Sequence, residues 1–410
     1  MSAAPAGRLE IRPGRENIAR YRVLRLVMSP RAPHDSQLGA DLSGDPRVVL
    51  VLDAGGTSFR FNAIQGGRAL LDAPHTLPSH GDDLARSLRQ ITDGFAAVHA
   101  ATGHRAVALS LAFPGPADYR RGVIGDLPNL TGFRGGVPLG PMLAAAFGLP
   151  AFVNNDGALF AYGEALGGLL PQINQRLAAA GSDRRFRNLL GFTLGTGFGG
   201  GIVIDGRMVI GDNSAAGQIW MTRHRDQRQR MAEEGASIRA VRRDYAAAAG
   251  IALDQAPDPK RIAEIAAGAA PGDRRAAAEA FHRLGQVAGD AIAGALALID
   301  GLVVLGGGLS GAADLFRAAL LDELNAPLEL ASGPVRRLPF DVVDLDDPAG
   351  LAALCRDDAR ALPVPGTDRT VAAPPPRCTG VGVTRLGTTA AIALGAYAYA
   401  LGELGTPADR

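Results

Sequence analysis

A glycine-rich turn follows the first strongly apolar stretch of the sequence, in VVLVLDAGGTSFR. The predicted strand ends at Asp53, and Gly55, Gly56 and Thr57 lead straight into another strand. Two glycines let the backbone approach a phosphate closely, with N–H groups and the threonine hydroxyl aimed at its oxygens. A carboxylate at the strand end can hold Mg²⁺ through water. Taken alone, the motif fits a plain glycine hairpin turn equally well.

A second glycine-rich loop lies in LLGFTLGTGFGGGIVIDG. It contains Gly195, Thr196 and Gly197, and it again stands between two predicted strands. The segment matches the GxGxxG pattern of dinucleotide-binding folds, but that pattern needs a helix after the loop. Because a strand follows here, we exclude that interpretation. Two strand–loop–strand units in one chain indicate a pair of hairpins that hold one polyphosphate from either side.

A third glycine run lies in LVVLGGGLS, between a buried-type strand and a helix. Its members are Gly306, Gly307 and Gly308. Glycines at this point let a flat ring lie against the backbone. An ordinary turn at the start of a helix explains the run equally well. The residues alone leave both interpretations open.

The segment AFVNNDGALF carries a short strand into a helix, with Asn155 and Asp156 at the junction. By residue type, Asp156 is a strong candidate for the helix N-cap. A strand-to-helix junction is also where α/β enzymes expose catalytic side chains, so Asp156 could act as a general base at a substrate hydroxyl. The two interpretations are compatible.

These motifs sit on elements that alternate between strands and helices. The apolar runs predict strands at 48–53, 106–113 and 188–194, and the periodic stretches predict helices at 83–101 and 312–325. Such alternation predicts an α/β fold.

Together, the ordered motifs resemble those of the ROK family of sugar kinases, within the hexokinase and actin-like ATPase superfamily. LDAGGTSFR resembles the family's first phosphate motif, FTLGTGFGGGIV its second and LVVLGGGLS its adenosine motif. PNLTGF and VNNDG resemble its two sugar-site segments, and RLGTTAAIALGAYAYAL resembles its closing helix. The set is specific because five motifs keep their order and spacing across residues 48–325. The resemblance implies an α/β, two-lobed actin-like ATPase (ribonuclease H-like) fold with a cleft between the lobes.

The resemblance also implies roles for individual residues. Asp156 would take the proton from the sugar hydroxyl that attacks the γ-phosphate of ATP, with Mg²⁺ as the second cofactor. Phosphoryl transfer depends mainly on positioning and charge stabilisation, so glycine loops, Mg²⁺ and one carboxylate suffice. Asn129 and Asn155 would hydrogen-bond sugar hydroxyls. Gln218, in a segment similar to the family's GEIGH motif, and Glu233 would also bind the sugar.

The chain departs from the family pattern around this GEIGH-like segment. The motif's glutamate is here Gln218 and its histidine is Met221, and TRHRDQRQRM replaces the Cys-rich zinc loop that usually follows. This stretch holds His224 and no cysteine, whereas a structural zinc site needs four ligands, so we expect no zinc. The only tryptophan, Trp220, is expected either at the wall of the sugar pocket or as a core residue in place of the zinc loop.

The resemblance suggests a division of the chain into lobes. We expect an N-terminal extension at 1–45 and a smaller sugar- and phosphate-side lobe at 46–158. A closing helix at 388–402 should complete this lobe. The larger, nucleotide-side lobe would span 159–387, with an insertion at about 344–380 in a Pro-rich stretch.

Composition excludes several functional classes. The 410 residues are 47% hydrophobic with a net charge of +1, which describes a globular chain and argues against a general nucleic-acid binder. The sequence contains no run of 18 apolar residues, which a membrane-spanning helix would need. The N-terminus lacks the apolar core of a signal peptide. Two cysteines cannot build a disulfide framework, which fits a reducing cytoplasm. We therefore expect a cytoplasmic homodimer whose partners are a small sugar and a nucleotide, with no nucleic acid and no membrane.

The functional hypothesis is an ATP- and Mg²⁺-dependent kinase of a hexose or N-acetylhexosamine, similar to a glucokinase. The family also includes sugar-sensing transcriptional repressors with an added N-terminal helix-turn-helix domain. Residues 1–45 are short and poor in helical periodicity for such a domain. A kinase-like protein that binds sugar with little catalysis is a further alternative, because Gln218 and Met221 replace the family's residues.

Overall fold

The computed structural model describes residues 42–356, 361–373 and 377–405. All of them belong to one compact unit, residues 36–410. The extension expected at 1–45 lies almost wholly outside the described residues. In the described ranges no helix is both long and apolar enough to cross a membrane.

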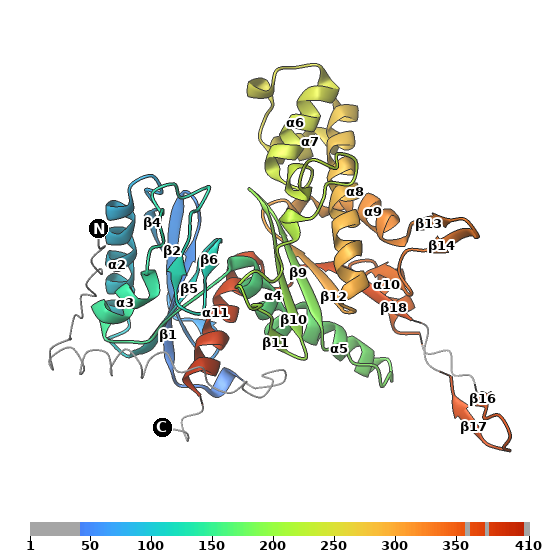
Figure 1. The fold of residues 1–410 in the computed structure, drawn as a ribbon, viewed down its shortest axis with the longest axis horizontal. Coiled ribbons are helices and arrows are strands. Elements are labelled where there is room, and N and C mark those ends of the chain that lie inside the picture. The colour runs from blue at the N-terminus through green and yellow to red at the C-terminus, as the bar shows by residue number, and fades with distance from the viewer. Residues whose placement is uncertain (1–41, 357–360, 374–376, 406–410) are drawn as a thin grey trace, which may run out of the picture. The chain divides into compact units, whose positions relative to one another are not determined.

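The first sheet has the strand order β3–β2–β1–β5–β8, with β4 paired to β2 (Figure 1). β1 runs antiparallel to β2 and parallel to β5, and β5 runs parallel to β8. β1 is a continuous apolar run because both its faces are buried: Val49 and Val51 face one core cluster, and Leu50 and Leu52 face another. The elements are β1 (Val48–Ala54), β2 (Ser58–Gln65), β3 (Arg68–Ala69), β4 (His75–Pro78), α2 (Leu84–Ala101), β5 (Ala106–Ala112), β6 (Ala117–Asp118), β7 (Val123–Ile124), α3 (Leu139–Phe147) and β8 (Ala151–Asn154), after the short turn η1 (Leu42–Gly44).

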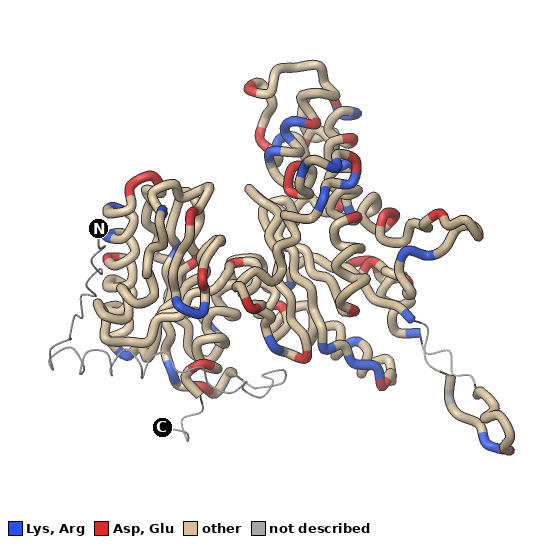
Figure 2. Tube along the Cα trace, in the orientation of Figure 1, with Lys and Arg blue, Asp and Glu red and all other residues tan. Residues whose placement is uncertain are grey.

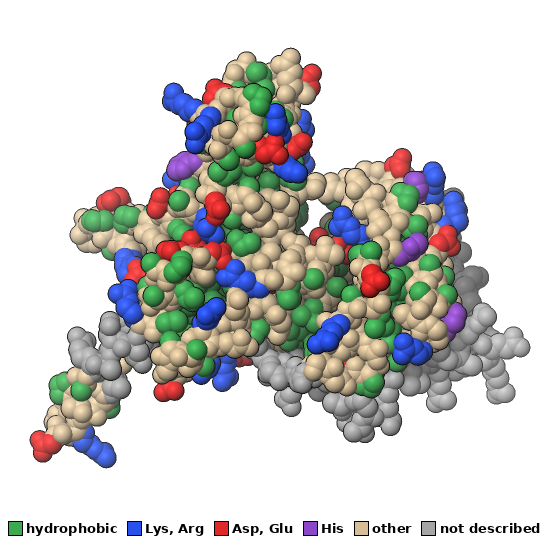
Figure 3. All heavy atoms as spheres, turned by 180° about the vertical axis from the view of Figure 1, so that it is seen from behind, with side chains coloured by type: hydrophobic (Ala, Val, Ile, Leu, Met, Phe, Trp, Pro, Cys, Tyr) green, Lys and Arg blue, Asp and Glu red, His purple; other side chains and the backbone are tan. Residues whose placement is uncertain are grey.

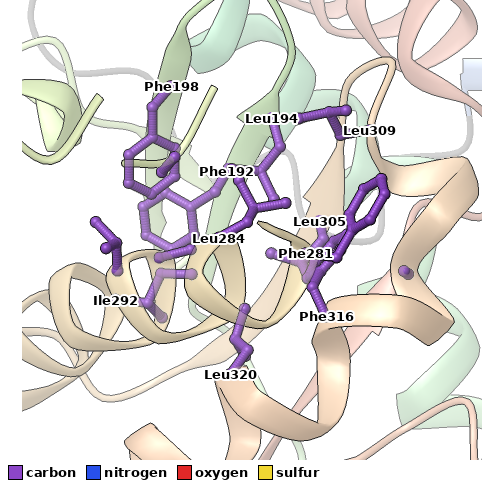
Figure 4. Packing of buried hydrophobic residues seen from close by; sticks show 14 of the residues in the cluster. Phe192, Leu194, Phe198, Phe281, Leu284, Ile292, Leu305, Leu309, Phe316 and Leu320 are labelled. Atoms are coloured by element: carbon purple, nitrogen blue, oxygen red, sulfur yellow. The ribbon is translucent and has the colours of Figure 1, made fainter. Parts of the chain in front are cut away.

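The second sheet has the order β11–β10–β9–β12–β18–β15. β9 pairs antiparallel with β10 and parallel with β12, and the parallel pairing continues through β18 to β15. Phe192 and Phe198 of this sheet pack with Phe281 and Phe316 of the helices that cover it (Figure 4). The strands are β9 (Leu189–Leu194), β10 (Phe198–Ile204), β11 (Arg207–Met208), β12 (Leu302–Gly306), β15 (Asp341–Asp344) and β18 (Cys378–Val383). The helices are α4 (Asp156–Gly167), α5 (Leu169–Ala179), α6 (Ile238–Ala249), α7 (Pro259–Ala266), α8 (Arg274–Leu298), α9 (Ala313–Asn325) and α11 (Thr388–Leu404), with short turns η2 (Ile219–Met221), η3 (Ala232–Glu234), η4 (Leu253–Gln255) and η5 (Ser310–Ala312).

Two helices that lie far apart in the sequence, α4 and α11, join the sheets. α4 packs on β9 and β10 of the second sheet, and α11 packs on β1 and β5 of the first, while the two helices lie side by side (Figure 1). The turn before α11 is fastened to α4 by Glu164, whose buried carboxylate accepts from the N–H groups of Arg385 and Leu386 at 3.1 Å each. A buried carboxylate is stable only when its oxygens receive such donors.

The segment expected as an insertion is partly built into the second sheet. β15 ends at Asp344 and β18 begins at Cys378, so both ends of the 344–380 segment lie in sheet strands. Between them come α10 (Pro348–Leu354) and a hairpin of β16 (Ala361–Pro363) and β17 (Thr370–Ala372). Another hairpin, β13 (Pro327–Leu330) with β14 (Gly333–Arg336), follows α9. The domain division at residue 158 stays a prediction, and that boundary falls inside α4.

The predicted strands and helices are confirmed to within one residue at the ends tested: the strand expected at 48–53 spans 48–54, and the helix expected at 83–101 spans 84–101. These elements were predictable because their apolar periodicity is long and uninterrupted. Charged residues of both signs are interspersed over the surface helices (Figure 2), in keeping with the net charge of +1. On the face drawn in Figure 3, apolar side chains are scattered among polar ones.

Candidate functional site

The start of α4 differs from the sequence prediction in one respect. The N-cap is Asn155, whose Oδ1 accepts the N–H of Ala158 at 3.1 Å, and the N-cap expected at Asp156 is wrong. Both residue types suit a cap, but Asn155 is the residue with extended backbone, at φ −66° and ψ 139°, while Asp156 is already helical. Asp156 is therefore free of the capping role, and its Oδ1 accepts the adjacent N–H of Gly157 at 2.9 Å.

Asp156 lies near the carboxylate of Asp53, at the end of β1. Burial raises the pKa of Asp156, because water is removed from its charged form. Burial and then the negative charge of Asp156 raise the pKa of Asp53 to about 6, against a smaller opposing effect of Arg60. Arg60 Nη1 stands 3.8 Å from Asp53 Oδ2, which is a long ion pair. When Asp53 and Asp156 are both ionised, the distant guanidinium of Arg60 offsets their negative charges only weakly.

This carboxylate pair fits a hard divalent cation. Mg²⁺ prefers carboxylate oxygens and water, and a bound cation reverses the electrostatic cost of placing two negative charges together. Asp53 is the residue that would hold it. Groups of three or more His, Cys, Asp or Glu side chains arranged to hold a metal do not occur among the described residues, so the protein would share such an ion with water and phosphate.

The first glycine loop is exposed and lies against the PNLTGF segment. Gly55 donates its N–H to Ser58 O at 3.0 Å, which closes the turn between β1 and β2. A Cβ added to Gly56 would lie 3.8 Å from Asn129 Cβ, so Asn129 is in van der Waals range of this loop. Asn129 is itself exposed. The structure thus brings one predicted sugar-site residue to the predicted phosphate loop.

The second and third glycine loops touch each other. Leu309 donates its N–H to Leu194 O at 2.9 Å, and a Cβ on Gly307 would lie 2.3 Å from that same oxygen. Gly307, at φ +85°, therefore has to be glycine for both backbone conformation and space. A Cβ on Gly195 would lie 3.8 Å from Gly308 N. The segments that resemble the second phosphate motif and the adenosine motif form one continuous surface.

α4 connects this surface to Asp156. A Cβ on Gly157 would lie 2.9 Å from Gly200 N, so the first turn of α4 packs directly on β10 of the second glycine hairpin. Asp156 is one residue away from this contact and interacts electrostatically with Asp53 of β1. The two glycine hairpins and the acidic residue thus belong to neighbouring parts of one site.

Gln218 and Glu233 are both engaged by other protein groups. The Trp220 indole N–H donates to Gln218 Oε1. Glu233 Oε2 accepts the N–H of Phe198 at 3.0 Å, and its Oε1 accepts from Arg239 at 2.9 Å. A Cβ on Gly197 would lie 2.5 Å from Glu233 Oε2, so Glu233 supports the second glycine loop. Sugar contacts by these two residues stay predictions.

Two residues of this region were not recognised from the sequence. His224 is 6% exposed, and its Nδ1 accepts the N–H groups of Asp226 at 3.1 Å and Gln227 at 3.3 Å, which fixes the loop that replaces the family's zinc loop. The Tyr119 hydroxyl contacts the Nδ2 of Asn155 at 3.2 Å. A single histidine inside an arginine-rich stretch was a local signal for the first, whereas nothing local indicated the second.

Comparisons with known proteins agree on one family. The model of the ROK family matches residues 49–331. The crystal structure of a glucokinase from Parabacteroides distasonis is 50% identical, with a TM-score of 0.78, and covers 88% of this chain and 98% of that one. A glucokinase of Thermotoga maritima is 28% identical over 182 residues, which are 42% of this chain and 50% of the relative. The chain thus spans about half the length of the curated relatives it matches.

The fold agrees with these matches. A ROK family glucokinase from Streptomyces griseus, crystallised with glucose and AMPPNP, is 20% identical with a TM-score of 0.58 and covers 86% of this chain and 98% of that one. A likeness at that identity supports the fold alone, and the predicted two-lobed actin-like ATPase fold is confirmed. With a family model matched over more than half of its length, the chain belongs to the ROK family.

Proposed function

We propose that this protein is a sugar kinase that transfers the γ-phosphoryl group of ATP to a hydroxyl of a hexose or N-acetylhexosamine. The observation that carries the proposal is the position of Asp156 at the first residue of α4, released from capping by Asn155. Similarity to proteins named glucokinases supports the substrate class.

Asp156 is the general base in this proposal. Its raised pKa, caused by burial, brings the carboxylate closer to the pH at which a base both stays ionised and accepts a proton readily. The carboxylate would take the proton of the attacking hydroxyl as the new O–P bond forms and the bond from the γ-phosphorus to the β–γ bridging oxygen breaks, which releases ADP. Asn129 and Asn155 are the proposed contacts to other sugar hydroxyls, and Gln218 and Glu233 are proposed to bind the sugar as well.

The glycine loops form the nucleotide side of the proposal. The N–H groups of Gly56 and Thr57 would donate to phosphate oxygens, and Gly55, whose own N–H closes the turn, would let the backbone come close to the phosphate. The joined surface of the second and third loops would bind the rest of ATP. Mg²⁺, when bound, supplies charge neutralisation of the phosphates. Asp53 would hold the Mg²⁺ ion, whose positive charge would offset the negative charges of Asp53 and Asp156.

The test is an ADP-release assay with Mg·ATP and a panel of glucose, mannose and their N-acetylamino derivatives. We expect sugar-dependent ADP formation for one class of sugar, lost in Asp156→Asn and kept in Asp93→Asn. Asp93 is a matched control because it is an exposed aspartate of α2. Sugar binding without phosphorylation would instead support the alternatives of a regulator or a weakly catalytic relative.

The homodimer expected from the sequence is also a proposal. Light scattering coupled to gel filtration measures the mass of the particle directly. A mass of twice 42.3 kDa is the expected result.

A further inference from the structure

Tyr119 is a buried tyrosine whose hydroxyl is held at both of its hydrogen-bonding positions. It lies between β6 and β7 and is 6% exposed. The hydroxyl donates to Phe113 O at 3.1 Å and accepts from Asn155 Nδ2 at 3.2 Å. Because the Phe113 carbonyl fixes the direction of the O–H, the hydroxyl lone pair faces the Asn155 amide.

The Asn155 side chain therefore has both ends fixed. Its Nδ2 is bound by Tyr119, and its Oδ1 accepts the N–H of Ala158 as the cap of α4. The terminal torsion of an asparagine is broad unless hydrogen bonds hold it. The Tyr119 hydroxyl thus selects the amide orientation that caps the helix whose first residue is Asp156.

The backbone of Tyr119 is tied to the other sheet's loop. Its N–H donates to Ser214 Oγ at 3.2 Å. Ser214 is 8% exposed and has φ +55°, a left-handed conformation that favours glycine, so the fold maintains it against a backbone cost. It precedes Gln218 by four residues. Tyr119 is therefore bonded both to the α4 start and to the loop that leads to the predicted sugar segment.

An open cavity lies beside the segment that carries Tyr119. The cavity of about 620 Å³ is lined by residues on both sides of position 119, including Asp118 and Arg120, and by the loop residues Asp212 to Ser214. The side chain of Tyr119 is absent from this lining and points instead to Asn155. Its neighbours face the cavity, whereas Tyr119 faces the site.

We infer that Tyr119 is a positioning residue for the proposed general base, acting through the Asn155 cap on Asp156 and tying that cap to the loop before Gln218. This inference rests on the proposed function for its kinetic consequences. Its structural step, the control of the first turn of α4 by the Tyr119 hydroxyl, does not depend on which reaction the protein performs.

The test is Tyr119→Phe, which removes the hydroxyl and keeps the ring. We expect kcat to fall by a factor on the order of ten to a hundred, as for a slightly misplaced catalytic group, while the KM for the sugar changes little. Tyr245→Phe is the matched control, because Tyr245 is a buried tyrosine of α6 in a core cluster that contains neither Tyr119 nor Asn155. It should leave kcat unchanged.

Two further measurements identify the route of the effect. Adding Tyr119→Phe to Asn155→Ala should cause no additional loss of kcat, because the hydroxyl acts through the amide. In Tyr119→Phe alone, hydrogen exchange of the Ala158 N–H should speed up by a factor on the order of five or more, since its acceptor is no longer held.

The outcomes separate this inference from the proposed function. Wild-type kcat and wild-type Ala158 exchange in Tyr119→Phe, with Asp156→Asn inactive, would overturn the inference and leave the kinase intact. If the wild-type protein phosphorylates no sugar, the proposed function fails, and Ala158 exchange still decides the inference. Additive losses in the double variant would also overturn it, because Tyr119 would then act independently of Asn155.

Discussion

Gly163 of α4 and Ala391 of α11 are in backbone contact: a Cβ added to Gly163 would lie 1.9 Å from the Ala391 carbonyl oxygen. The reciprocal contact repeats one turn away, where a Cβ on Gly395 would lie 2.1 Å from Leu159 O. Neither backbone can yield locally, because each belongs to a regular helix that is also packed on a sheet. This crossing is where the two sheets are joined.

We expect Gly163→Ala to destabilise the protein by about 1–3 kcal/mol or more, because the added methyl group has no space. The matched control is Gly294→Ala in α8. Gly294 is exposed, a Cβ there would meet nothing within 4 Å, and alanine should stabilise the helix by about 0.5–1 kcal/mol. Denaturant unfolding of both variants measures the difference. If both substitutions changed the free energy of unfolding in the same direction, the packing argument would be contradicted.

Asp156→Asn should lower kcat by a factor on the order of 10² to 10⁴, because a positioned base contributes about that much. Its thermal unfolding midpoint should not fall below that of the wild type, since Asn155 provides the cap and the substitution removes a charge that burial disfavours. Asn155→Ala, in contrast, should cost about 1 kcal/mol of stability. Turnover and calorimetry on both variants test the assignment. An Asp156→Asn protein that unfolds early would return the capping role to Asp156.

Asp53 should make the metal-free protein less stable as the pH rises. Its folded pKa of about 6 lies above the unfolded value, so the unfolded state loses its proton first, and stability falls between about pH 4 and pH 6. Asp53→Asn should remove this loss, which amounts to at most about 3 kcal/mol. The melting temperatures of the wild type and of Asp53→Asn should therefore be similar at pH 4, and at pH 8 the variant should melt at the higher temperature.

The same variant tests the metal assignment. Mg²⁺ with a nucleotide should raise the melting temperature of the wild type more than that of Asp53→Asn, because the compensated charge is missing in the variant. Equal metal dependence of turnover in the two proteins would remove Asp53 from the site.

His224 should produce the opposite kind of pH dependence. Burial lowers the pKa of its imidazole, and Nδ1 accepts two N–H groups only when it carries no proton. The unfolded chain takes up a proton first as the pH falls, so this contribution to stability is complete above about pH 6.5 and is lost as the pH falls through the lower folded value. His224→Leu should flatten that part of the stability profile. An unchanged slope below pH 6.5 would show that the imidazole does not hold the loop.

Trp220 should report sugar binding through its fluorescence. Its indole N–H donates to Gln218 Oε1, and no other tryptophan contributes to the emission. If a sugar hydroxyl competes for that amide oxygen, the indole loses its partner and the emission changes in a saturable way. The titration needs no nucleotide. A flat response to a sugar that the protein phosphorylates would place Gln218 away from the substrate.

Sequence patterns predicted those parts of the fold that depend on local chemistry. The glycine loops and the strands beside them were recognised because glycine and apolar runs leave few alternative structures. The cap was assigned to the wrong neighbour because asparagine and aspartate have nearly equal cap preferences. Only the structure distinguishes the two residues, because Asn155 has extended backbone and Asp156 is the first residue of α4. The bond from Tyr119 to Asn155 joins residues 36 positions apart, and no local pattern encodes such a contact.

Because α11 packs on the first sheet, one face of β1 is covered only late in synthesis of the chain. The face of β1 that carries Val49 and Val51 shares a core cluster with Ala396 and Tyr397, which are made almost 350 residues later. Until α11 has left the ribosome, that apolar face has no permanent cover, and the nascent chain presents it to chaperones and to other chains. Shortening the chain within α11 should therefore affect the solubility of the first-made strands before it affects the glycine loops.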